Sequence, residues 1–93
     1  MIHFVVHSNA DSVGVAVVED IQAGQALTGW IMDTDQTVDI TVSAPIPIGH
    51  KLALRDVAEG DTVIKYGHDI GIAVAPIPQG AHLHVHNVKT KRW

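Results

Sequence analysis

Three histidines alternate along a short stretch near the carboxyl end of the chain. They are His82, His84 and His86, three of the seven histidines in the sequence. Alternate side chains of a strand share a face, so a strand over residues 80–87 would leave the imidazoles free for chemistry while Leu83 and Val85 anchor a core. Neighbouring histidines, roughly 6.5 Å apart at Cα, could bind one metal ion, whereas His82 and His86, about 13 Å apart, could not without a bulge. The spacing therefore predicts a site that uses an adjacent pair and further ligands from elsewhere.

Two other basic segments place a histidine near a glycine. These segments are Gly49-His50-Lys51 and Lys65-Tyr66-Gly67-His68. Glycine lets the backbone and neighbouring side chains approach a ligand closely, and loops of this kind often carry binding residues. Cationic and proton-transferring groups beside one cleft would suit an anionic small molecule. Solvation of a turn is the competing interpretation for each of these residues.

The composition limits the fold and the function. The chain has 93 residues, of which 46% are hydrophobic and 4% aromatic, which predicts a single small domain over residues 1–93 with a β-rich core. Cysteine is absent, which excludes disulfides and thiolate zinc sites. A net charge of −4 argues against a nucleic-acid-binding protein. No apolar run approaches the ~20 residues of a membrane span, and the N-terminus does not resemble a signal peptide, so we expect a cytoplasmic protein.

Alternation of apolar and polar residues predicts a mainly β chain. The clearest strand is Thr37–Val42, which places Val38, Ile40 and Val42 on one face. Further strands are predicted over residues 2–7, 13–18 and 26–32, and turns rich in Asp, Asn and Gly separate them. Residues 50–56 are the one segment that suggests a short helix.

A weak internal repeat runs through the chain. Each copy has an apolar residue, a glycine three positions later and another apolar residue three positions beyond the glycine. The copies are Asp20–Leu27, Pro45–Leu52, Asp56–Val63 and Pro76–Leu83. Their irregular spacing argues against a solenoid. We expect short strands that reuse one type of turn, with a positive φ angle at each glycine.

Four motifs in this order resemble the SAF domain of the altronate and galactarate dehydratase family. They are Pro47-Ile48-Gly49-His50-Lys51-Leu52-Ala53-Leu54, Gly60-Asp61-Thr62-Val63-Ile64-Lys65-Tyr66-Gly67, Ile70-Gly71-Ile72-Ala73 and His84-Val85-His86-Asn87. The segment Asp11-Ser12-Val13-Gly14-Val15-Ala16 also resembles the opening of that domain. Any one motif alone is weak, but four in the same order are specific.

The resemblance implies a small SAF-type β-clip domain and a separate large subunit that carries much of the active site. A free-standing domain of this size is similar to the small subunit of a two-subunit lyase in the family, which eliminates sulfite from a 2-hydroxy-3-sulfo acid. The small subunit of a split sugar-acid dehydratase is one alternative. A non-catalytic SAF binding module is another, from a different functional class.

The resemblance also implies roles for individual residues. His84 and His86 would hold a divalent metal ion, iron by the same resemblance, and the ion would stabilise the charge that forms when the α-proton of the acid is abstracted. The expected catalytic residues are His50, Lys51 and His86. The expected substrate-binding residues are Lys65, Tyr66 and Asn87, although capping of a turn is an equal alternative for Asn87.

The other histidines and the C-terminal tail are assigned roles outside the catalytic site. We interpret His82 as an exposed strand histidine, and we interpret the three histidines without a motif as structural. These three are His3, His7 and His68. The tail from Lys89 to Trp93 is predicted to dock to a partner, because an exposed terminal tryptophan is a frequent interface residue.

Overall fold

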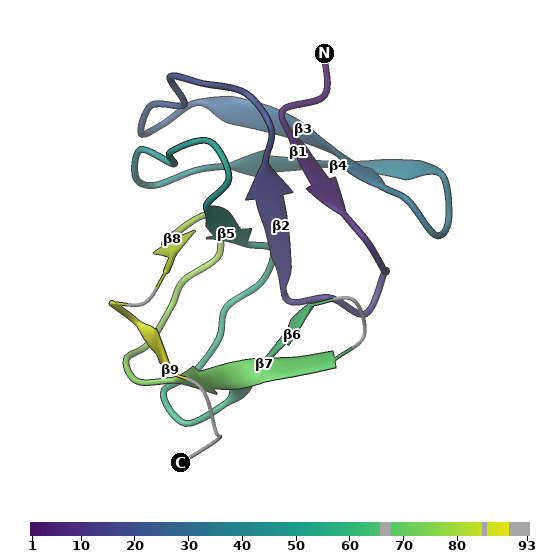
Figure 1. The fold of residues 1–93 in the computed structure, drawn as a ribbon. Helices are drawn as coiled ribbons and strands as arrows, with labels where there is room; N and C mark the ends of the chain where they lie inside the picture. Colours follow the sequence, from purple (N-terminus) through teal and green to yellow (C-terminus); the bar gives the residue numbers. More distant parts are fainter. Residues whose placement is uncertain (66–67, 85, 90–93) are drawn as a thin grey trace.

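The computed structural model describes residues 1–65, 68–84 and 86–89. The described residues form nine β-strands and no helix (Figure 1). The strands are β1 (Phe4–Val6), β2 (Val13–Ala16), β3 (Ala26–Ile31), β4 (Gln36–Thr41), β5 (Lys51–Ala53), β6 (Thr62–Lys65), β7 (His68–Ala73), β8 (His82–Leu83) and β9 (Val88–Lys89). The prediction of a mainly β fold is therefore confirmed. No stretch of these described residues builds a helix long and apolar enough to cross a membrane.

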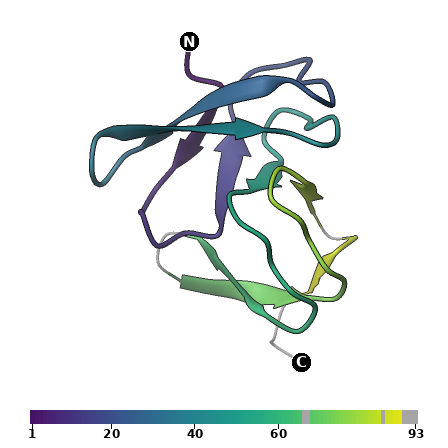
Figure 2. The same ribbon diagram turned by 180° about the vertical axis from the view of Figure 1, so that it is seen from behind.

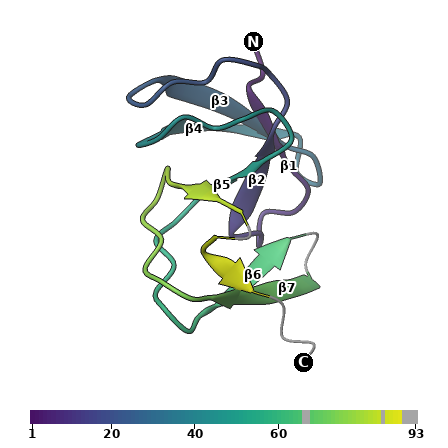
Figure 3. The ribbon, with the colours of Figure 1, turned by 60° about the vertical axis from the view of Figure 1, so that its left-hand side comes forward.

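The described strands form two sheets. One has six strands in the order β4-β3-β1-β2-β5-β8, and the other has three in the order β6-β7-β9. Neighbouring strands are antiparallel except β1 and β3, which are parallel. Figures 1 and 3 show β3 and β4 at one end of the molecule, β6 and β7 at the other, and β5 and β8 between them. The view from behind in Figure 2 shows the loops that follow β5 and β7 running side by side, and a bridge between Val57 and Ile77 joins them.

The strand predictions in the first half of the chain are confirmed, and the helix prediction is wrong. Strands β1 to β3 fall within their predicted segments and are shorter than predicted, and β4 begins and ends one residue earlier than the predicted Thr37–Val42. On β4 and just after it, Ile40 and Val42 are buried and Val38 is half-buried, as the alternation requires. The predicted helix over residues 50–56 is instead strand β5. It lies between β2 and β8, which use its backbone hydrogen-bonding groups on both sides.

The internal repeat forms one turn four times. The φ angles are 85° at Gly24, 84° at Gly49, 90° at Gly60 and 85° at Gly80. In each copy the residue after the glycine donates its N–H to the carbonyl two residues before the glycine, at 3.0 to 3.2 Å, which is the hydrogen bond of a type II turn. The apolar residues that open the copies pair across the molecule, Ile21 with Ile46 and Val57 with Ile77. The predicted turn is confirmed, and it fixes where each following strand begins.

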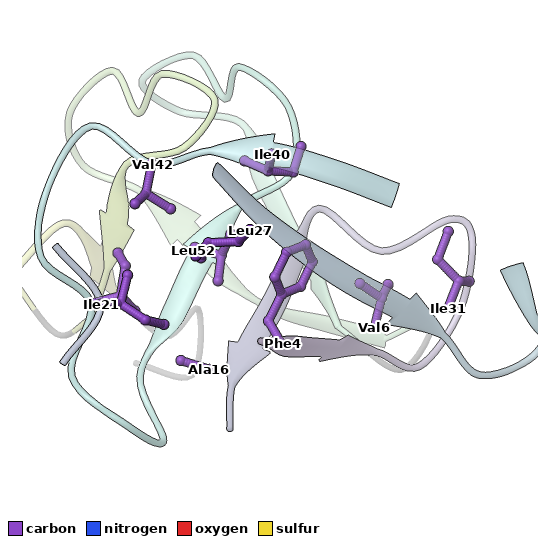
Figure 4. Close-up of a cluster of buried hydrophobic side chains, with 10 residues drawn as sticks. Phe4, Val6, Ala16, Ile21, Leu27, Ile31, Ile40, Val42 and Leu52 are labelled. Carbon is purple, nitrogen blue, oxygen red and sulfur yellow. The ribbon is translucent and has the colours of Figure 1, made fainter. Parts of the chain in front are cut away.

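Two buried clusters form the core. The first surrounds Phe4, whose ring lies beside Leu27 and Leu52 (Figure 4). The second contains Leu83 together with side chains from β2, β5, β6 and β7, so it joins the two sheets. Leu83 is 0% exposed, which confirms its predicted role as the core anchor of the histidine stretch.

Gly29 makes room for the ring of Phe4. A Cβ atom at residue 29 would overlap the ring atoms of Phe4. We therefore expect Gly29→Ala to lower the free energy of unfolding by about 1–3 kcal/mol, because the ring must leave its place in the core. Denaturant titration measures this change. Thr37→Ala, at an exposed position of β4, is the control and should stay within about 0.5 kcal/mol. Equal transition midpoints for the two variants would contradict this role of Gly29.

Candidate active site

The candidate site lies where β5 pairs with β8. In this antiparallel ladder Lys51 is the partner of Leu83, and Leu52 is the partner of His82. The pairing brings the Gly49-His50-Lys51 segment beside the histidine stretch, although His50 and His82 are 32 residues apart in the chain. Two groups that are separate in the sequence thus form one cluster.

Four imidazole rings gather at this place. The ring of His50 stacks on that of His84 at 4.0 Å between centroids and lies 5.0 Å from that of His82, and the rings of His82 and His84 are 6.1 Å apart, so the three rings form a triangle. The ring of His86 lies 5.1 Å from His82 on a tilted plane. Nδ1 of His50 and Nε2 of His82 are 2.8 Å apart, so one of these nitrogens carries the shared proton and the other accepts it. Protons can therefore pass between two rings of the cluster.

The prediction of one strand over residues 80–87 is wrong. Strand β8 ends at Leu83, the chain bends at His84, and residues 86 and 87 form a turn. The carbonyl of His84 accepts hydrogen bonds from the backbone N–H groups of Asn87 and Val88, at 3.2 and 3.1 Å. This turn brings the imidazoles of His82 and His86 together, whereas an extended strand would separate them. Val85 lies outside the described residues.

The side chain of Asn87 holds this turn. Its Oδ1 accepts the backbone N–H of His84 at 3.1 Å, and its Nδ2 donates to the carbonyl of His82 at 2.9 Å. The amide thereby positions the backbone of both histidines. One N–H and one oxygen lone pair remain for other partners, so capping the turn does not prevent a contact with substrate.

Crowding and burial lower the pKa of two of these imidazoles. For His82, burial is the main cause of the lowered pKa, followed by the neighbouring His50, His86 and His84. The pKa of the exposed His84 is lowered by desolvation and by the positive charges of His50, Lys51 and His86. Both shifts favour the neutral ring, which is the form that binds metals and accepts protons.

Lys51 stands at the edge of the cluster, and Lys65 lies close enough to Lys51 to affect its charge. Burial and the charge of Lys65 lower the pKa of Lys51. Lys65 ends β6 and lines a cavity of about 130 Å³. An anion bound beside Lys51 would favour its charged form. Tyr66, the other predicted substrate-binding residue of this segment, lies outside the described residues.

The donor set suits a divalent ion only in part. Neutral imidazoles are good ligands for iron and zinc, and the facing nitrogens of His50 and His82 could converge on an ion. Within residues 1–65, 68–84 and 86–89, however, no group of three or more His, Asp and Glu side chains is arranged to hold one. Any ion at this cluster therefore needs ligands from outside the described residues.

The interpretation of His82 as an exposed strand histidine is wrong, because its ring is half-buried and hydrogen-bonded to His50. No pattern in the sequence indicates which strands pair, so the sequence held no signal for this contact. His3 accepts the backbone N–H of Thr28 through Nδ1 at 3.0 Å, which fits a structural role. His7 lines the cavity together with Lys65. The side chain of His68 lies outside the described part of the structure.

The chain belongs to the family defined by the altronate/galactarate dehydratase SAF domain, whose model matches residues 2–91. Among known proteins, it is 64% identical to the (2R)-sulfolactate sulfo-lyase subunit alpha of Chromohalobacter salexigens, over 99% of this chain and 98% of that one. The subunit alpha of Paracoccus pantotrophus is 57% identical over 58% of this chain and 81% of its own length. Altronate dehydratase of Bacillus subtilis is 42% identical over 86% of this chain but only 15% of its own length. The predicted family is thus confirmed.

The lowered pKa of His82 predicts how stability depends on pH. The unfolded chain binds more protons than the folded chain below pH ~6.5, so the free energy of unfolding of the metal-free protein should fall as the pH drops below that value. His82→Gln should weaken this dependence. Denaturant titrations at about pH 7.5 and about pH 5.5 measure both effects. An equal loss of stability in the two proteins would contradict the assignment to His82.

Proposed function

We propose that this chain is the small subunit of a two-subunit carbon–sulfur lyase that eliminates sulfite from (2R)-sulfolactate. The observation that carries the proposal is the 64% identity, over nearly the whole of both chains, to a protein named as the alpha subunit of that enzyme. The cluster of four imidazoles with Lys51 beside it supports the proposal, because elimination from an anionic acid needs proton transfer and positive charge.

The reaction breaks two bonds on neighbouring carbons. A base removes the proton from the α-carbon, the electron pair of that bond forms a double bond, and sulfite leaves from the β-carbon with the electrons of the C–S bond. We assign His50 to proton transfer because its Nδ1 shares a proton with Nε2 of His82. Lys51 and His86 stand within the same cluster and are the other catalytic candidates. Lys65 and Asn87, with Tyr66, are the proposed contacts to the anionic groups of the substrate.

A divalent metal ion, which we propose to be iron, completes this site. When bound, it would act as a Lewis acid toward the carboxylate and hydroxyl of the substrate and stabilise the charge that develops on the α-carbon. His84 and His86 are the proposed ligands from this chain. Their neutral rings can donate to the ion, and the partner subunit would supply further ligands.

A sugar-acid dehydratase divided into two chains is the second candidate. The match to the altronate dehydratase of Bacillus subtilis favours it, since that reaction also removes an α-proton and a β-substituent. The two candidates differ in the leaving group, sulfite in one and water in the other. The shorter coverage of the dehydratase, 15% of its length against 98% of the alpha subunit, favours the sulfo-lyase.

Sulfite release from sulfolactate tests the proposed activity. The chain combined with the large subunit of the Chromohalobacter salexigens enzyme should release sulfite from sulfolactate, whereas the chain alone should be silent, because a domain of this size does not build both walls of a closed cleft. Sulfite assay and altronate consumption are measured in parallel. Turnover by this chain alone would contradict the small-subunit role, and altronate consumption without sulfite release would favour the dehydratase.

Metal content tests the ligand assignment. Elemental analysis of the purified complex should find a divalent ion, and His84→Ala or His86→Ala should lower its occupancy severalfold, with a smaller loss for His82→Ala. His3→Ala is the matched control, because its ring bonds to the backbone of Thr28 in another part of the sheet and should leave the metal content unchanged. Equal metal content in all four variants would exclude a site at these histidines.

A further inference from the structure

The imidazole ring of His50 is held on two sides. Its Nδ1 lies 2.8 Å from Nε2 of His82, which is a hydrogen-bond distance, and its face stacks on the ring of His84 with 16° between the two planes. The hydrogen bond restrains the ring within its plane, and the stacked neighbour restrains it perpendicular to that plane. Because Nδ1 is engaged with His82, the ring of His50 can exchange a proton with a substrate only through Nε2.

His82 is suited to orient this ring, because its own position is fixed. Its backbone pairs with Leu52 of β5, and its carbonyl accepts Nδ2 of Asn87 at 2.9 Å. Leu52 and Leu83, the strand partner and the next residue of His82, are both 0% exposed. A third group that bonds the second nitrogen of a proton-transferring histidine sets the tautomer and the direction of that histidine in many enzymes. His82 stands in this place relative to His50.

The position of the shared proton decides what His50 can do. A neutral imidazole has one N–H and one lone pair, so a proton on Nδ1 of His50 leaves the lone pair on Nε2. A base that removes the α-proton of the substrate needs that lone pair. If His82 donated the hydrogen bond instead, Nε2 of His50 would already carry a proton and could not accept another.

We propose that His82 is a positioning residue, which accepts the Nδ1 proton of His50 and so holds His50 as a base with its lone pair on Nε2. The inference rests on the proposed function, from which the need for a base is taken. Nε2 of His50 takes the α-proton, the electrons of the C–H bond form the double bond, and sulfite leaves with the electrons of the C–S bond. His50 is then an imidazolium, whose charged Nδ1–H bonds more strongly to the neutral ring of His82.

Nitrogen NMR of the full chain, produced with isotope-labelled histidine, reads this tautomer. At about pH 7.5, where most imidazoles are neutral, the proton of His50 should be on Nδ1 and its Nε2 should have the chemical shift of an unprotonated ring nitrogen. The signals are assigned by their loss in His50→Gln. In His82→Phe the preference should disappear, because a ring without nitrogen cannot accept the proton. A protonated Nε2 of His50 in the unsubstituted, neutral chain would overturn the proposal.

Kinetics of the complex with the large subunit of the Chromohalobacter salexigens enzyme provide the second test. His82→Phe should lower kcat about 10-fold or more and change KM less than about twofold, because the base loses its orientation while the substrate contacts remain. His82→Gln should recover most of kcat, since its Oε1 can accept the Nδ1 proton of His50 from a similar place. His3→Gln is the matched control and should leave both constants unchanged, because the ring of His3 bonds to the backbone of Thr28 instead.

Each rate is divided by the metal content of its complex, so that a lost ion is not counted as a misplaced base. Equal losses of kcat in His82→Phe and His82→Gln would contradict a role through the hydrogen bond, as would an unchanged kcat in His82→Phe. A complex of the unsubstituted chain that releases no sulfite would refute the proposed activity, whereas the NMR measurement on the chain alone would still decide how His82 holds His50.

Discussion

The pairing of β5 with β8 is the interaction on which the rest of the site depends. Leu52 pairs with His82 and Lys51 pairs with Leu83. These two pairs place the histidine stretch and Lys51 beside each other. The pairing is short, and buried Leu52 and Leu83 support it from the two cores of the molecule. The candidate site therefore lies where the two buried clusters meet.

Repeated turns set where the strands of this small domain begin. A glycine at positive φ reverses the chain four times, and the apolar residue at the start of each copy bridges to its counterpart in another copy. The turns and bridges bring side chains from segments far apart in the sequence within a few ångströms of one another. His50, which directly follows one of these glycines, reaches the histidine stretch in this way.

The charge of the cluster explains why a partner is expected. Burial and the charge of Lys65 lower the pKa of Lys51, and desolvation together with neighbouring charges lowers the pKa of His82 and His84 and favours their neutral forms. An anion bound beside Lys51 would favour its charged form.

The sequence by itself determined the class of the fold, the strands of the first half, the four glycine turns and the family, because these are local patterns. The alternation of apolar and polar residues predicts which side chains of a strand are buried, and a glycine at the same place in each repeat predicts a turn. The sequence also identified His50, Lys51, His84 and His86 as candidates, since their types and their motifs are visible without a fold.

Only the tertiary structure decided that β5 is a strand and that His82 belongs to the cluster. It also decided that Asn87 turns the chain before a longer strand can form. The pairing of β5 and the contact of His82 join segments that lie far apart, 32 residues for His50 and His82, and a local pattern does not state which strands will pair. The hydrogen bonds of Asn87 span only three and five residues, but the sequence left its side chain an equal choice between capping a turn and binding substrate.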